Sequence, residues 1–351
     1  LKAGRRPSAR KKKGKGVIMM GKGKILKVAK NTASILAFPL LMFAAMAVIT
    51  AAKGVSGLYF SKNMVTQVIL NASLMTIIAL AIYLQFKNGR FDFSGGATMI
   101  LSAVIAGNVS LNAGGNPVMF LVLAVLTGIA LSLLTATAYV FSRVPIVICT
   151  IGVTLIYESM TYLLYKGEGL NIISDIGFSA FGRLPAVFVP LVLALVVFLF
   201  YSYFTTEGRR SKLLAGNQKV AVNIGIREEK SVYVTYLFAG ILLGLAAVVY
   251  GSRNTVGPQA NLSTSGILFS YIVPVFIGMF LGSFSVDAIG IVAASLGMQL
   301  MNYGLDCLGL GAGGWQQIIF GLFMLGFYAF SAQIGNIKKL FAKRGKREQY
   351  A

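Results

Sequence analysis

Long stretches without a charged residue follow one another along the chain, separated by short charged blocks. Asp, Glu, Lys and Arg are all absent from residues 31–52, 64–86, 94–142, 184–206, 231–252, 254–286, 288–305 and 307–337. About 20 apolar residues are enough for a helix to cross the hydrocarbon core of a bilayer. Residues 191–200 (LVLALVVFLF) also lack the polar face that a surface helix of a soluble protein carries. The pattern therefore predicts an all-α, polytopic membrane protein.

Ten membrane segments account for these stretches. We expect them at residues 31–52, 64–86, 94–109, 118–138, 145–165, 185–204, 231–250, 266–282, 286–304 and 315–335. The third is short and begins at Ser94-Gly95-Gly96, and the eighth contains Pro274. Interrupted segments at membrane depth are tolerated against protein or a water-filled cavity, and in transporters they often mark the substrate path.

The basic residues predict the orientation of these segments. If the chain starts in the cytoplasm and crosses ten times, 27 of the 32 Lys and Arg residues lie on the inner side. Such an excess is the positive-inside rule. We therefore expect a multi-pass protein of the cytoplasmic (inner) membrane with both termini inside. It has a basic tail at residues 1–30, a transmembrane domain at 31–337 and a basic tail at 338–351.

The composition excludes several classes of protein. Only 12% of the residues are charged, about half the roughly 25% of a soluble domain. The net charge of +22 would suit a nucleic-acid binder, but no aromatic residue interrupts the lysines of residues 1–30. We expect this tail to contact anionic lipid headgroups of the bilayer, and no nucleic acid.

The chain also lacks the residues that common catalytic and cofactor sites need. It contains no His, its two cysteines form no CxxC pair, and no GK[ST] phosphate-binding motif occurs. We therefore expect no enzyme activity, metal or cofactor in this chain. If the protein uses ATP, a separate partner subunit must bind it.

Polar side chains inside or beside the segments are candidates for a solute path, because such groups usually face a bundle interior or a cavity. Gln67 and Asn71 share one helix face, as do Gln299 and Asn302. Amides suit a neutral, hydroxyl-rich solute, but interhelical hydrogen bonds explain them equally well. Asp92 stands where a helix N-cap would, and Glu158 is the acid clearly inside a span. The full candidate set is Gln67, Asn71, Asp92, Ser94, Thr150, Glu158, Gln299 and Asn302.

Two further patterns concern packing and partners. Gly240-xxx-Gly244 and Gly278-xxx-Gly282 fit close contacts between helices. Residues 206–230 mix apolar and charged positions on the cytoplasmic side. This loop predicts one or two short helices at the membrane surface with a face for a partner, and a plain solvated loop is the alternative.

Several motifs in residues 64–335 match one known family. Residues 91–96 (FDFSGG) are similar to its D-L-S-V-G motif, and residues 144–152 (VPIVICTIG) to its VP-x-F-I-x-T-L-G motif. Trp315-Gln316-Gln317 fits the aromatic-Gln start of its last span. Its cytoplasmic G-R…G-N…A…G-I loop is matched by Gly208, Arg209, Gly216, Asn217, Ala221, Gly225 and Ile226. The chain thus resembles the membrane permease of ribose-type sugar importers of the ATP-binding-cassette (ABC) class.

The resemblance implies a permease for a monosaccharide or similar polyhydroxy solute. Its implied partners are an ATPase subunit that docks on the 206–230 loop, an extracytoplasmic solute-binding protein and a second permease copy, most simply an identical one. Two departures from the family pattern leave the identity of the solute undecided. Residues 278–287 lack the family's Gly-rich pattern, and Glu158-Ser159 stands where many members have Arg-Gly. A nucleoside or branched-chain amino acid is the alternative. An ion-coupled secondary transporter would need titratable groups on the path, where Glu158 is nearly alone.

Overall fold

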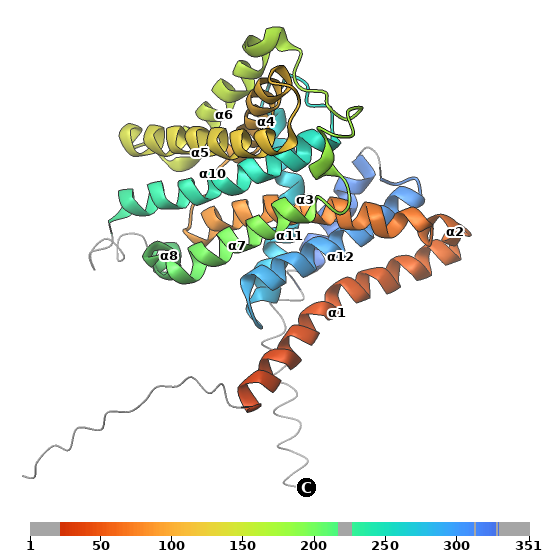
Figure 1. Cartoon of the computed structure of the whole chain (residues 1–351). Coiled ribbons are helices and arrows are strands. Elements are labelled where there is room, and N and C mark those ends of the chain that lie inside the picture. Colours follow the sequence, from red (N-terminus) through yellow and green to blue (C-terminus); the bar gives the residue numbers. More distant parts are fainter. Residues whose placement is uncertain (1–21, 217–226, 312–313, 328, 330–351) are drawn as a thin grey trace, which may run out of the picture.

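The computed structural model describes residues 22–216, 227–311, 314–327 and 329. Within these ranges the regular structure is helical, with one isolated antiparallel bridge between Leu170 and Val256. The helices are α1 (Lys22–Ala52), α2 (Ser56–Tyr59), α3 (Lys62–Lys87), α4 (Gly95–Asn112), α5 (Pro117–Ser142), α6 (Ile146–Leu163), α7 (Phe188–Phe204), α8 (Thr206–Gly216), α10 (Glu228–Arg253), α11 (Ser263–Gly282) and α12 (Asp287–Cys307). A last helix covers Gly314–Phe327 (Figure 1).

Each of the ten expected segments overlaps an apolar helix, although residues 328 and 330–335 of the tenth lie outside the described residues. Eight helices of the described residues are long and apolar enough to cross a membrane, and Phe188–Phe204 and Gly314–Phe327 are shorter apolar helices. These two correspond to the sixth and tenth expected segments. The all-α, polytopic prediction is therefore confirmed.

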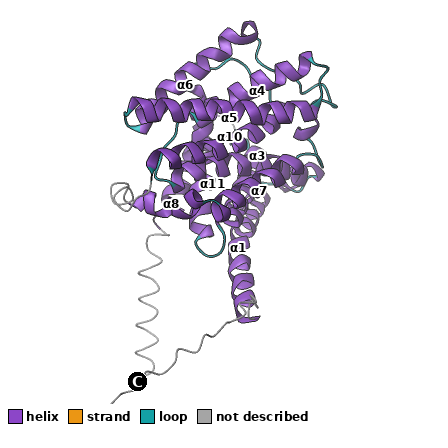
Figure 2. Cartoon of the chain, turned by 60° about the vertical axis from the view of Figure 1, so that its left-hand side comes forward, coloured by secondary structure: helices purple, strands orange, loops and turns teal. Residues whose placement is uncertain are grey.

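The helix that carries the first span extends beyond the predicted segment. It begins at Lys22, inside the stretch assigned to the basic tail, whereas the candidate membrane span within it, Ile35–Ala52, agrees with the predicted residues 31–52. Lysine is a good helix former, so the absence of charge identifies the apolar part of α1 but not its start. In Figures 1 and 2 the N-terminal part of α1 projects beyond the rest of the bundle.

Two large apolar clusters form most of the core of the bundle. One joins α3, α4, α5, α7, α10, α11 and the start of α12 around side chains such as Ile77, Ile100 and Leu242. The other joins α1, α3, α11, α12 and the last helix around Met42, Ile277 and Met298. Because α3, α11 and α12 contribute to both clusters, these three helices connect them.

Glycines allow the closest helix contacts, as the two GxxxG patterns predict. A Cβ on Gly240 would overlap the carbonyl oxygen of Gly128 in α5, and one on Gly244 would overlap that of Ala124. Gly278 in α11 lies equally close to Ile291 in α12. The backbones of α5 and α10 therefore touch directly, and these helices lie side by side in Figure 1.

Candidate functional site

A polar cavity of about 410 Å³ lies between α3, α11, α12 and the last helix. Two predicted path residues of α12, Gln299 and Asn302, line it together. The Asn302 amide donates to Gln299 Oε1 at 3.4 Å, and Gln316 Nε2 donates to Asn302 Oδ1 at 3.4 Å. The other lining residues are Met75, Ser270, Tyr271, Gly314, Gln316, Gln317 and Phe320.

The chemistry of this lining suits a neutral solute with several hydroxyl groups. The amide hydrogen bonds are long compared with the usual 2.7–3.2 Å range for N–H···O bonds, so the amides retain donors and acceptors for a ligand. Tyr271 and Phe320 add aromatic surface, and no lining residue is charged. The volume falls within the range of about 300–1,000 Å³ that is typical of small-molecule sites.

The other predicted amide pair is held by an arginine. Arg253, at the end of α10, donates from Nη2 to Asn71 Oδ1 at 2.7 Å and to Gln67 Oε1 at 3.5 Å. Its Nη1 donates to the carbonyl oxygen of Gly182 at 3.2 Å. Asn71 precedes Met75 by one turn of α3, so this cluster lies next to the cavity along the same helix face.

Glu158 of α6 is placed as a cap for a different helix. Its carboxylate accepts from Leu262 N and Thr264 N, both at 2.8 Å, and from Thr264 Oγ1 at 2.6 Å. These groups lie at the start of α11, where backbone N–H groups have no partner within the helix. Glu158 is 1% exposed and is not among the residues that line the amide cavity.

Asp92, Ser94 and Thr150 come together near the start of α4, away from the amide cavity. Asp92 Oδ1 accepts from the N–H and the hydroxyl of Ser94, both at 2.7 Å, and Phe93 N donates to Thr150 Oγ1 at 3.2 Å. The N-cap of α4 is Ser94, two residues beyond the position expected from Asp92. Burial raises the pKa of the Asp92 carboxyl, and the hydrogen bonds from Ser94 lower it in part.

The helix expected within residues 206–230 is present as α8. Gly208 donates from its N–H to Thr205 Oγ1 at 3.0 Å, and a Cβ at Gly208 would overlap the Tyr201 carbonyl oxygen. Arg209 Nη1 donates to the Tyr203 carbonyl oxygen at 2.9 Å. Both residues thus fix α8 against the end of α7.

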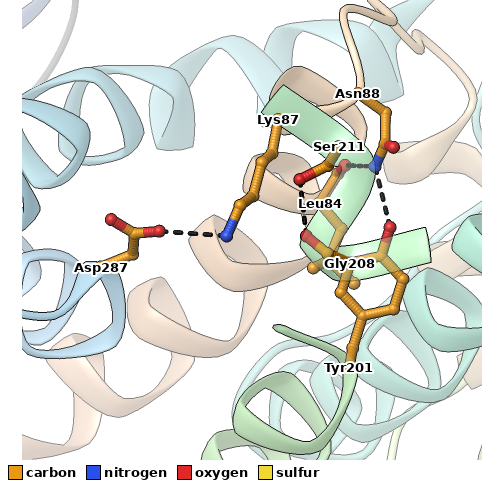
Figure 3. A network of polar contacts seen from close by, with 7 residues as sticks. All are labelled: Leu84, Lys87, Asn88, Tyr201, Gly208, Ser211 and Asp287. Carbon is orange, nitrogen blue, oxygen red and sulfur yellow. Dashed lines mark hydrogen bonds and ion pairs between the residues drawn. The ribbon is translucent and has the colours of Figure 1, made fainter. Parts of the chain in front are cut away.

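Further contacts at this end of the molecule join α7 to the end of α3, and α3 to α12. Asn88 donates to the Tyr201 hydroxyl at 2.9 Å, and Lys87 forms an ion pair with Asp287 at 3.1 Å (Figure 3). Gly216 ends α8. The remaining residues of the predicted docking motif, Asn217, Ala221, Gly225 and Ile226, lie outside the described residues.

Comparison with known proteins identifies the family. The family described as "Branched-chain amino acid transport system / permease component" matches residues 64–328, most of the chain. The chain belongs to this permease family. Together with its apolar helices, this makes the permease a multi-pass protein of the cell membrane.

Curated relatives of the permease are import permeases. It is 26% identical over 288 residues to the autoinducer 2 import system permease LsrC of Photorhabdus luminescens, covering 79% of this chain and 84% of the relative. It is 26% identical to the ribose import permease RbsC of Bacillus subtilis, covering 71% and 77%. It is 24% identical to the fructose import permease FruG of Bifidobacterium longum, covering 77% and 83%. These relatives confirm the resemblance inferred from the motifs, and no solved structure matches the chain.

Sequence reasoning missed several residues of the site. Arg253 is not a predicted site residue, because nothing in the sequence places it near Gln67 and Asn71. The sequence gives no signal for Tyr271, and Gln316 and Gln317 appear in it only as part of a motif. Two adjacent glutamines at the start of an otherwise apolar helix are a signal that would place Gln316 and Gln317 among the candidate site residues.

We expect Arg253→Ala to lower the free energy of unfolding of the permease by about 1–3 kcal/mol, because it leaves amide and carbonyl acceptors without their charged donor. The loop of residues 164–187 should also exchange its amide hydrogens faster, since Arg253 ties Gly182 to α3. Thermal unfolding and hydrogen exchange measure both effects. Arg183→Ala is the control, because the Arg183 side chain donates to Ile173 O within the same loop and reaches no other helix among the described residues. Equal melting temperatures for the two variants would contradict the bridging role of Arg253.

Proposed function

We propose that this permease is the membrane-spanning translocation subunit of an ABC importer for a small, neutral, polyhydroxy solute such as a monosaccharide. The single observation that carries the proposal is the uncharged, amide-lined cavity around Gln299 and Asn302. Amides and aromatic faces together bind both the hydroxyls and the apolar surface of a sugar. The ribose and fructose import permeases among the relatives support the same solute class.

The cavity argues against the amino-acid alternative. A branched-chain amino acid carries a carboxylate and an ammonium group, and burying either without a charged partner is costly. No residue that lines the cavity is charged. A nucleoside is neutral and is the second candidate, because Tyr271 and Phe320 offer aromatic surface to a base.

The permease is expected to work with partner proteins, as its family of transport-system components suggests. ATP is bound and hydrolysed by a separate ATPase subunit, which docks on residues 206–230, with Gly208, Arg209 and Gly216 on α8. An extracytoplasmic binding protein delivers the solute, and a second copy of the permease completes the translocation path. Among the described residues, no cluster of three or more Asp, Glu or Cys side chains is placed to hold a metal ion.

Uptake into proteoliposomes that contain the complete importer tests the solute class. We expect Asn302→Ala and Gln299→Ala to lower the maximal uptake rate about fivefold each, the effect of losing one hydrogen bond of about 1 kcal/mol. The half-saturation concentration should change little, because the binding protein sets it. Asn63→Ala is the matched control, since Asn63 is an exposed amide at the start of α3 outside the cavity.

Competition by unlabelled solutes separates the candidates. Monosaccharides should inhibit uptake, whereas branched-chain amino acids should not. Inhibition by nucleosides alone would replace the first candidate with the second. Unchanged uptake in both cavity variants would remove the amide cavity from the solute path.

A further inference from the structure

The amides that Arg253 holds have a fixed orientation. A guanidinium carries hydrogen-bond donors only, so the amide oxygen of Asn71, 2.7 Å from Arg253 Nη2, must face it. Gln67 Oε1 faces the same nitrogen at 3.5 Å. Both amides therefore turn their NH2 groups away from Arg253. By the distribution of basic residues, this end of α3 is the extracytoplasmic one.

These NH2 groups are available to a ligand. Neither Gln67 Nε2 nor Asn71 Nδ2 has a hydrogen-bond partner among the described residues. Gln67 is exposed and Asn71 is half-buried, and the Asn71 nitrogen is not among the fully buried polar atoms that lack a partner. The cluster thus presents two oriented and accessible donor groups.

The charge of the cluster indicates which ligand it accepts. No carboxylate pairs with Arg253 in the part of the chain that the structure describes, so the cluster keeps a positive charge. Donors without an anionic acceptor suit the oxygens of a neutral, hydroxyl-rich solute. The same positive charge disfavours a solute that carries an ammonium group.

The cluster lies directly outside the amide cavity. Asn71 precedes Met75, which lines the cavity, by four residues on the same face of α3, or about 6 Å at 1.5 Å per residue. Tyr271, another lining residue, lies within electrostatic range of Arg253. A solute that comes from outside along this face of α3 therefore meets the Arg253 cluster before the cavity.

We propose that Gln67, Asn71 and Arg253 form an entry site for the solute, ahead of the cavity around Gln299 and Asn302. The two amides donate to solute oxygens, and Arg253 is a positioning residue that orients them. This inference rests on the proposed function, because it follows the same polyhydroxy solute along the same path. In a purely structural role, the amides would serve only to hold Arg253 in place.

Asn71→Asp separates these two roles. It keeps an oxygen for Arg253, with a stronger charge-assisted bond, and it replaces the free NH2 group with an acceptor. We expect the complete importer in proteoliposomes to take up labelled ribose or fructose about fivefold more slowly at saturating binding protein, through the loss of one hydrogen bond to the solute. The melting temperature should stay the same or rise. A purely structural role predicts no loss of uptake.

Asn63→Asp is the matched control. Asn63 is an exposed amide in the first turn of the same helix and makes no hydrogen bond to Arg253. The same change of charge two turns away from Asn71 should leave uptake within about twofold of the unmodified importer, because exposed charges at that separation are largely screened.

Thiol labelling tests access to the site without transport. The background variant carries Cys149→Ser and Cys307→Ser, which remove both cysteines of the chain. In spheroplasts, Asn71→Cys should then react with a membrane-impermeant maleimide added outside, and ribose or fructose should slow the reaction. Ala72→Cys is the control, because Ala72 is the next residue of α3 and is only 3% exposed. It should stay unlabelled.

Three results would overturn the entry site: full uptake by Asn71→Asp, equal losses in Asn71→Asp and Asn63→Asp, or no labelling of Asn71→Cys. Failure of the proposed function looks different, since the unmodified importer would then take up no monosaccharide at all. Slower labelling of Asn71→Cys in the presence of nucleosides alone would in that case keep the entry site and change its solute.

Discussion

Replacing Glu158 with alanine is expected to lower the free energy of unfolding of the permease by about 3 kcal/mol, the loss of more than one charge-assisted hydrogen bond. The substitution leaves the N–H groups of Leu262 and Thr264 and the Thr264 hydroxyl without their acceptor in a buried place. It also removes a negative charge from the N-terminus of α11, where the helix dipole favours one. Thermal unfolding of the purified protein measures the effect.

Two further variants identify the cause of the loss of stability in Glu158→Ala. Glu158→Gln keeps one oxygen acceptor and the side-chain volume, so it should destabilise less than the alanine variant. Glu168→Ala removes an exposed carboxylate a short distance along the chain and should change the melting temperature little. If Glu158→Gln abolishes uptake while it melts like the unmodified protein, Glu158 acts on the solute path and not as a cap.

Glu158 also illustrates the limit of prediction from the sequence. An acid inside an apolar span faces a bundle interior or a cavity, which makes Glu158 a candidate for the solute path in the sequence. The partner is the start of a helix about 100 residues further along the chain, and a single sequence holds no signal for such a contact. The same limit applies to Arg253 and Asn71, which are separated by 182 residues.

Features that depend on local composition were predicted well. The charge-free stretches located the spans, because burial in lipid excludes charge over the whole length of a helix. Spacing of three or four residues correctly placed Gln299 beside Asn302. The N-cap of α4 lies two residues from the predicted position, and α1 starts before the predicted span, because helix ends depend on backbone geometry more than on composition.

The largest loss of folded protein is expected from Gly244→Val in α10. A Cβ at this position would overlap the carbonyl oxygen of Ala124 and lie 2.6 Å from the Val125 Cα, so the backbones of α5 and α10 would have to separate. Gly240 and Gly128 meet one turn away in the same crossing. Backbone atoms cannot rotate aside as the end of a side chain can, so the cost exceeds the 1–3 kcal/mol that is typical of overpacking.

The amount of monodisperse protein after size-exclusion chromatography measures this effect, and Gly244→Ala provides a milder step in which the melting temperature remains measurable. Gly152→Ala in α6 is the control, because its Cβ would meet no atom within 4 Å. Alanine is favoured over glycine in a helix by about 1 kcal/mol, so this control should melt at the same temperature as the unmodified protein or higher. A Gly244→Ala variant as stable as Gly152→Ala would mean that α5 and α10 do not touch at this glycine, and the packing of the larger apolar cluster would have to be revised.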